Sequence, residues 1–247
     1  WAGLTPVFCD VDQETHMITS EKVQELITSN TSSILGVHIW GNACKPEALE
    51  ELCQQNNISL IFDASHAFGC HYNDQNISEL GRAAYFSFNS KHIINGFEGA
   101  CIATNDSALA EKLKTIRNFH DSEVFTTVSV RFNAKMSEAQ AALALIALEG
   151  LDDNIKINKH KYITYKKQLS NIPGLSLVTY NDDNNYEHIA LIIDQKRCGL
   201  SQDYFKAALE AENIQCSKQL LLGIHTSGVN VQNSQIQNTH KLLESLL

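Results

Sequence analysis

Residues 32–65 read SSILGVHIWGNACKPEALEELCQQNNISLIFDAS, two apolar runs separated by a helical pattern. The runs at 32–40 and 59–65 are short and rich in branched residues, which predicts buried strands. The segment 45–57 has Pro46 in its first turn and apolar residues on one side, which predicts a helix. This strand–helix–strand order is typical of two parallel strands joined by a crossover helix.

The alternation continues on both sides of this unit. Further strands are expected at 6–12, 83–88 and 100–106, and further helices at 20–30 and 107–119. The strands are apolar along nearly their whole length, which favours burial on both sides. The sequence therefore predicts an α/β fold, with a mostly parallel sheet covered by helices on both faces.

The second half of the chain predicts a connecting helix and a smaller unit. Ser137 and Gln140 have capping-box spacing, so a helix should begin there. Residues 141–148 are apolar all round, which predicts burial, and 151–169 keep one apolar stripe, which predicts a long surface helix. Strands at 175–180 and 187–194 and a helix at 201–213 follow. We expect residues 1–171 to be part of a large domain and 172–247 part of a small C-terminal α+β domain.

Composition limits the class of protein. Of 247 residues, 43% are hydrophobic, and the net charge is −9, which argues against nucleic acid or an anionic membrane surface as partner. No apolar stretch reaches membrane-spanning length. The seven cysteines are scattered and form no CxxC pair, as expected of reduced thiols in a cytoplasmic protein. The chain starts at Trp1 rather than Met, so we do not expect this to be its natural start.

Few residues stand out as candidates for chemistry. Asp63 closes a predicted strand at its carboxyl end, where open parallel sheets bind ligands, although a helix cap or turn is the commoner role. His66 and His71 flank Cys70, but no fourth ligand lies at a suitable spacing, so no metal site is expected. Asn133 precedes a helix as a turn residue would.

These blocks occur in an order that resembles a known family. The stretches WAGLTPVFCDVD, VHIWGNACKPEALEELC, LIFDASHAFG, SFNSKHIINGFEGACIATND and FNAKMSEAQAAL resemble the DegT/DnrJ/StrS family of pyridoxal-phosphate-dependent sugar aminotransferases. GNAC, FEGA and NAKMSE are most similar to its 4-amino-4,6-dideoxyhexose branch. The resemblance is fragmentary at both ends: family members carry a Gly-Thr phosphate loop before WAGLTPVF and continue beyond LLESLL. It implies a fold type I architecture.

The resemblance also implies roles for single residues. Asp63 matches the aspartate that pairs with the pyridine nitrogen of the cofactor, pyridoxal 5'-phosphate. His66 matches a residue near the ring oxygen, and Ser87 a serine that binds the phosphate. Asn133 matches an asparagine that reaches the phosphate in the neighbouring subunit, which implies a homodimer with shared active sites. The implied reaction moves an amino group, from glutamate as amino donor, to a nucleotide-linked 4-keto-6-deoxyhexose.

One departure from the family concerns the catalytic lysine. Family members read S-F-x-x-x-K, and an ungapped match places His92 at that lysine and Lys91 one residue earlier. Imidazole has no primary amine, but it can act as a general base near neutral pH. Three alternatives remain: an aminotransferase in which Lys91 reaches the cofactor, a dehydratase that uses pyridoxamine 5'-phosphate with His92 as base, or a non-catalytic homologue.

Overall fold

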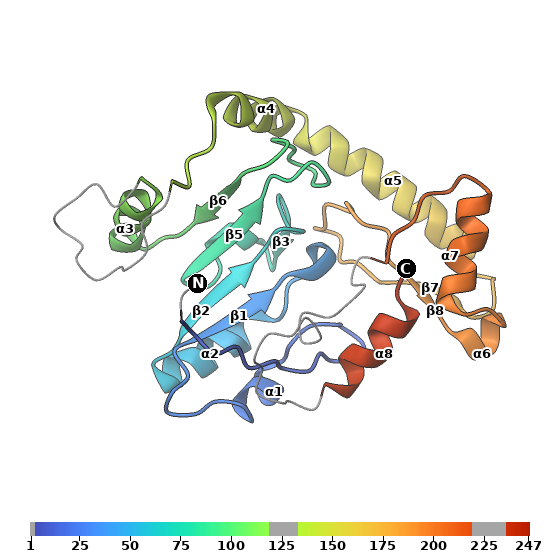
Figure 1. Ribbon diagram of the computed structural model, residues 1–247, viewed down its shortest axis with the longest axis horizontal. Coiled ribbons are helices and arrows are strands. Elements are labelled where there is room, and N and C mark those ends of the chain that lie inside the picture. The colour runs from blue at the N-terminus through green and yellow to red at the C-terminus, as the bar shows by residue number, and fades with distance from the viewer. Residues whose placement is uncertain (1–2, 119–132, 219–235) are drawn as a thin grey trace.

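The centre of the protein is a four-stranded sheet in the order β1-β2-β5-β6 (Figure 1). The computed structural model describes residues 3–118, 133–218 and 236–247. β1 (Ser33–Val37), β2 (Ser59–Asp63) and β5 (Ala83–Ser87) are parallel, and β6 (Ala100–Ala103) runs antiparallel to β5. The predicted mostly parallel sheet and α/β class are confirmed.

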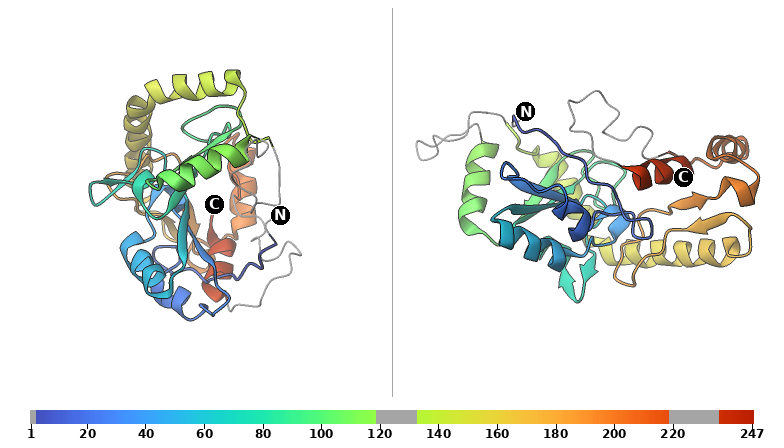
Figure 2. Two further views of the ribbon diagram at one scale, coloured as in Figure 1. Left: turned by 90° about the vertical axis from the view of Figure 1, so that its left-hand side faces the viewer. Right: turned by 90° about the horizontal axis from the view of Figure 1, so that it is seen from below.

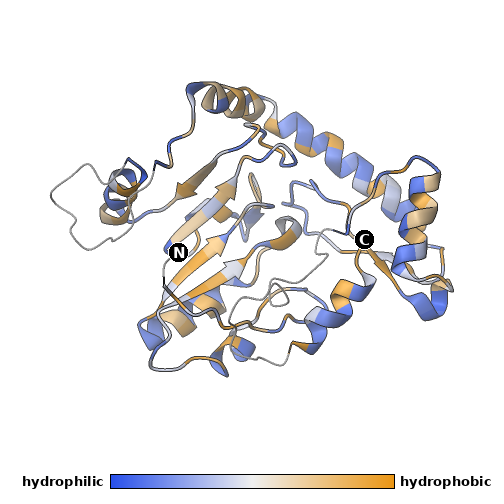
Figure 3. Cartoon of the chain, viewed as in Figure 1, coloured by the Kyte–Doolittle hydropathy of each residue, from blue (hydrophilic) through white to orange (hydrophobic). Residues whose placement is uncertain are grey.

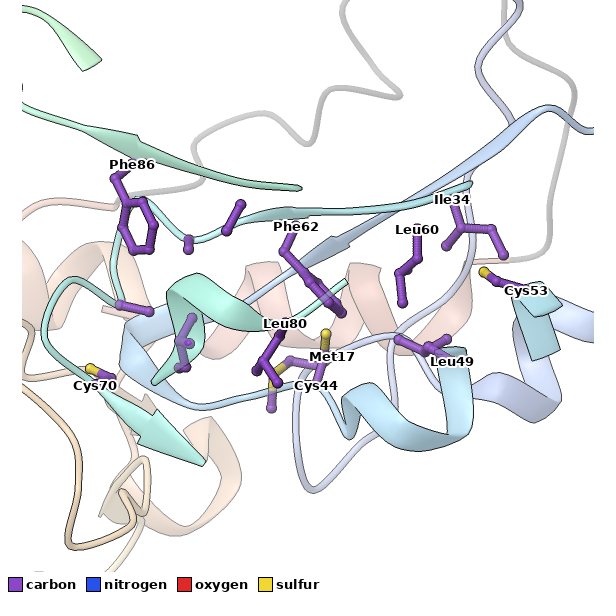
Figure 4. Close-up of a cluster of buried hydrophobic side chains, with 14 of the residues drawn as sticks. Met17, Ile34, Cys44, Leu49, Cys53, Leu60, Phe62, Cys70, Leu80 and Phe86 are labelled. Atoms are coloured by element: carbon purple, nitrogen blue, oxygen red, sulfur yellow. The ribbon is translucent and has the colours of Figure 1, made fainter. Parts of the chain in front are cut away.

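The crossover helix α2 (Pro46–Asn56) packs on one face of this sheet. It begins with Pro46 at its first position, as predicted, because proline lacks only an N–H that a helix start leaves unpaired. Leu60 and Phe62 of β2 and Ile34 of β1 point to the same face of the sheet, where they join Leu49 of α2 in one cluster (Figure 4). All four side chains are less than 9% exposed. This cluster is the larger of two hydrophobic cores in the described part of the chain.

The opposite face of the sheet differs from the prediction. Leu35, Ile61, Tyr85 and Ile102 point the other way along their strands and are 61%, 37%, 39% and 49% exposed. The prediction that helices cover both faces is therefore wrong for the described residues. Figure 3 shows that β1 and β2 are mostly hydrophobic along their length, and successive side chains of a strand point to opposite faces. The pattern therefore indicated burial on both faces, which this part of the chain does not provide.

Several shorter elements complete the first half. They are α1 (Ser20–Gln24), the 3-10 turns η1 (Ile39–Gly41) and η2 (Ile77–Glu79), the hairpin of β3 (His71–Tyr72) and β4 (Gln75–Asn76), and α3 (Ser107–Arg117). The helix expected over 20–30 ends at Gln24. The strand expected over 6–12 is not formed, since only Val7 makes a β-bridge there. The helix expected over 107–119 ends at Arg117, and position 119 of the expected range lies outside the described residues.

Helix α4 (Glu138–Glu149) confirms one prediction and contradicts another. The Ser137 hydroxyl accepts from the Gln140 N–H at 3.2 Å, and the Gln140 side chain accepts from the Ser137 N–H at 3.0 Å, so the capping box is present. The expected burial of residues 141–148 is wrong, because Leu145 and Ile146 are each 63% exposed. Within the described residues the chain buries only Ala144 of this helix.

The long helix α5 (Leu151–Leu169) runs from α4 to the second half of the chain (Figures 1 and 2). There it meets a hairpin-like pair, β7 (Leu175–Leu177) and β8 (Leu191–Ile193), with α6 (Gln195–Cys198), α7 (Gln202–Ala211) and α8 (Gln237–Ser245). Tyr162 of α5 packs against Tyr180 and Tyr186 in the second core. None of the helices in the described ranges is long and apolar enough to cross a bilayer.

Candidate active site

Asp63 lies at the carboxyl end of the central strand β2, between Val37 of β1 and Tyr85 of β5. Its Oδ1 atom accepts from the N–H of Ser65 at 3.0 Å and from the Ser65 hydroxyl at 2.6 Å. The strand thus ends in an Asx turn that fixes the carboxylate at the edge of the sheet. This geometry is compatible with both roles expected of Asp63, a turn residue and a ligand-binding residue.

His66 follows in the loop after Asp63 and is held from two sides. The N–H of Trp40, a residue with a positive φ of 54°, donates to His66 Nδ1 at 3.3 Å. The buried Asn185 side chain donates to the carbonyls of His66 and Phe68 at 3.0 and 3.1 Å, which fixes the loop backbone. Burial lowers the pKa of His66 to about 4, so the ring is neutral at physiological pH.

The turn after β5 separates Lys91 from His92. The Asn89 side chain accepts from the Lys91 N–H at 3.2 Å, and the Asn89 carbonyl accepts from the His92 N–H at 2.9 Å. The hydroxyl of Ser87, the last residue of β5, accepts from the Asn89 N–H at 3.3 Å. This turn leaves Lys91 exposed and places the His92 ring 5.6 Å from that of His66, centroid to centroid.

Glu187 holds His92 in this position. Its Oε1 atom lies 2.8 Å from His92 Nδ1, and its Oε2 atom accepts from the Ile93 N–H at 2.9 Å. The side chain is only 6% exposed. Burial by itself raises the pKa of Glu187, but the nearby rings of His188 and His92 and the bond from the Ile93 N–H outweigh burial and lower it to about 2. Glu187 is therefore a buried anion at neutral pH.

His188 completes the group of side chains around Glu187. Its ring lies 4.2 Å from the ring of His66, and its Nε2 atom lies 3.1 Å from Glu187 Oε1. Sequence reasoning missed both Glu187 and His188, which lie more than ninety residues beyond His92. The only local signal was a charged pair at the start of a strand that was otherwise predicted as apolar.

The remaining expected site residue lies elsewhere. Asn133 is exposed, forms a bridge with Asn118, and accepts from the Lys135 N–H at 3.2 Å. The structure therefore brings Asp63, His66 and Ser87 to the carboxyl edge of the sheet with His92, while Lys91 and Asn133 are exposed. The single chain gives Asn133 no contact with this group among the described residues.

The sequence and fold match proteins of known activity. A curated relative, dTDP-4-amino-4,6-dideoxy-D-glucose transaminase of Shigella dysenteriae, is 31% identical over 214 residues, which cover 86% of this chain and 58% of the relative. The crystal structure of DesI with its TDP-sugar product superposes on the whole chain with a TM-score of 0.93 and 29% identity, and 64% of DesI is covered.

A third match shows the fold alone. The Escherichia coli GDP-4-keto-6-deoxy-D-mannose-3-dehydratase, solved with bound hydrated PLP, has a TM-score of 0.84 at 21% identity, over 99% of this chain and 69% of that one.

The chain spans about three fifths of the length of the first two relatives. A sequence profile of the DegT/DnrJ/EryC1/StrS aminotransferase family matches residues 1–246. With this profile match over nearly its whole length, the chain belongs to the DegT/DnrJ/EryC1/StrS aminotransferase family.

Proposed function

We propose that the protein is a nucleotide-sugar aminotransferase homologue that binds pyridoxal 5'-phosphate. Its reaction would transfer an amino group, from glutamate as donor, to a nucleotide-linked 4-keto-6-deoxyhexose. Family membership and the activity of the Shigella relative support this class of substrate. The observation that carries the proposal is the placement of Asp63 and His66 together at the carboxyl end of β2, the edge where open parallel sheets bind ligands.

The polar side chains present at this edge fit non-covalent binding of the cofactor. The Asp63 carboxylate would pair with the protonated pyridine nitrogen through a charge-assisted hydrogen bond. Because His66 Nδ1 accepts from Trp40, a neutral ring carries its proton on Nε2 and can donate to an oxygen. Ser87 offers a hydroxyl for the phosphate. When bound, the cofactor supplies an electron sink for chemistry at the substrate carbon.

Covalent attachment is where the residues fit less well. Lys91 has the only side-chain amine in the turn after β5, and it is exposed. The side chain that points inward, toward His66, is that of His92. This position favours a second candidate function, a nucleotide-sugar dehydratase that uses pyridoxamine 5'-phosphate. In it His92 would take a proton from the substrate carbon, oriented by its bond to Glu187.

Covalent trapping distinguishes these functions. The chain is mixed with pyridoxal phosphate, reduced with borohydride, and digested, and labelled peptides are quantified by mass spectrometry. Labelling of Lys91 well above the exposed Lys135 supports the aminotransferase. Retained cofactor without a Lys91 label supports the dehydratase. Absence of bound cofactor supports the non-catalytic homologue for this chain.

Two variants control this experiment. His92→Lys places an amine at the inward position and should be labelled there if the edge of the sheet holds the cofactor. Asp63→Asn should weaken cofactor binding in either function, because a neutral amide cannot keep the pyridine nitrogen protonated. An unlabelled His92→Lys variant would show that the cofactor does not bind at this edge.

We further infer a homodimer with shared active sites, a domain boundary near Ile172 and a cytoplasmic location. The exposure of Asn133 supports a shared site, since its side chain is available to a second subunit. Seven unpaired cysteines support a reducing compartment. Sedimentation equilibrium tests the homodimer, and a monomer at micromolar concentration would refute it.

A further inference from the structure

Three histidines from three separate segments meet beside Glu187. His66 lies in the loop after β2, His92 in the turn after β5, and His188 just before β8. One ring nitrogen of each lies within 4.8 Å of those of the other two. The side chains of His92 and His188 are 13% and 17% exposed, so the cluster is largely buried but open to solvent.

The hydrogen bonds of this cluster leave ring nitrogens available. Glu187 Oε1 lies 2.8 Å from His92 Nδ1, so this bond orients the ring and does not involve Nε2. His188 Nε2 is buried and has no hydrogen bond of acceptable geometry among the described atoms, although it lies 3.1 Å from Glu187 Oε1. A carboxylate that holds one nitrogen of a histidine, while the other binds a metal, is a common arrangement in metal sites.

We propose that His66, His92 and His188 bind one Zn²⁺ ion, with Glu187 positioning the His92 ring and water in the fourth place. Imidazole nitrogens are ligands that suit zinc, and three protein ligands with an open position are typical of non-structural zinc sites. The buried negative charge of Glu187 offsets part of the charge of the ion. Zinc and the proposed cofactor would both use His66 Nε2, so the inference concerns the chain without cofactor and needs no turnover.

The distances require a small closure of the cluster. Zn–N bonds of about 2.0–2.1 Å place tetrahedral ligand nitrogens about 3.3 Å apart, so the rings must approach by about 1.5 Å or less. Side-chain rotation can provide this without backbone change. Binding through His66 Nε2 puts the ring proton on Nδ1, so the long contact from the Trp40 N–H, at 3.3 Å, is lost. This loss is small beside three metal bonds.

Zinc binding to the untagged chain, without pyridoxal phosphate, tests the inference. Competition with a chromophoric chelator should show one Zn²⁺ per chain. His188→Asn and His92→Asn should each weaken binding by more than the 10–100-fold that loss of an outer-shell partner costs. His160→Asn, on the exposed face of α5, is the matched control and should leave affinity unchanged.

A second measurement covers variants that fail to fold, as judged by circular dichroism. Co²⁺ added to the unaltered chain should give the intense visible bands of a four- or five-coordinate site, with one equivalent at saturation. A pale octahedral spectrum, no zinc bound by the unaltered chain, or equal losses in His188→Asn and His160→Asn would overturn the inference. None of these outcomes bears on pyridoxal phosphate binding, which is tested separately by borohydride trapping.

Discussion

Replacing Glu187 with glutamine should destabilise the protein by about 3 kcal/mol at pH 7. The pKa of Glu187 falls from the ordinary 4.5 to about 2 in the folded chain. Each pKa unit corresponds to about 1.4 kcal/mol, so the ionised carboxylate contributes about 3 kcal/mol to the free energy of unfolding. Glutamine keeps the shape and one acceptor oxygen but removes the charge, which isolates this contribution.

The sign of the pH dependence follows from the lowered pKa. The contribution is fully present above pH 4.5, where Glu187 is ionised in both states, and is lost as the pH falls toward 2. Urea unfolding of both proteins should therefore show a constant difference between pH 7 and pH 5. Below pH 4.5 the two curves should approach each other, because the unfolded chain takes up the proton first.

Glu98→Gln provides the matched control. Glu98 is exposed and accepts one hydrogen bond, at 2.9 Å from Asn89, so its replacement should change stability by no more than about 0.5 kcal/mol. A Glu187→Gln variant within 1 kcal/mol of the parent would refute the reasoning, since the neighbouring histidines and the Ile93 N–H would then not outweigh the cost of burying the charge. So would a difference that stays the same from pH 7 to pH 3.5.

Three further predictions concern stability. Burial lowers the pKa of His38 to about 4, so the unfolded state binds more protons than the folded state between pH 6.5 and 4. The free energy of unfolding should therefore decrease by up to about 3 kcal/mol as the pH falls through this window. The His38→Asn variant should show a weaker pH dependence in thermal melts. Ser137→Ala removes the cap of α4 and should cost about 1 kcal/mol in urea unfolding, with faster amide exchange in the first turn of that helix. Gly41→Ala should cost more than Gly199→Ala, because both have positive φ but only the new Cβ at position 41 would lie 2.7 Å from Asn184. Strain alone should cost about 1–2 kcal/mol at Gly199, and equal losses at the two positions would refute the clash.

The sequence predicted most of what depends on neighbouring residues. The cap at Ser137, the start of α2 at Pro46 and the parallel strands are local signals, since each follows from spacing within one element. The exposure of Leu145 on α4 could not be predicted this way. An apolar pattern specifies which side chains need covering, but not whether this stretch of chain supplies the cover.

The site depended on contacts that no spacing reveals. Asp63 was found because a strand end is visible in the sequence. Glu187 was missed because its bonds to His92 and Ile93 cross more than ninety residues. The sequence allowed Lys91 and His92 as alternatives. Choosing between them required knowing that the Glu187 carboxylate, far along the chain, bonds to His92.

The hydrogen bonds of the turn after β5 allow an estimate of the free energy needed to bring Lys91 into the site. Moving Lys91 into the place of His92 would break the charged bond from His92 to Glu187, the bond from the Ile93 N–H to the same carboxylate, and the turn bond to Asn89. At about 1.5–3 kcal/mol for a bond to a charged group and about 1 kcal/mol for a neutral one, the shift costs about 4–7 kcal/mol. That is comparable to the whole stability of a typical domain, about 5–15 kcal/mol. Amino-group transfer through Lys91 therefore requires cofactor binding to supply this free energy, whereas proton transfer by His92 requires no rearrangement of the turn.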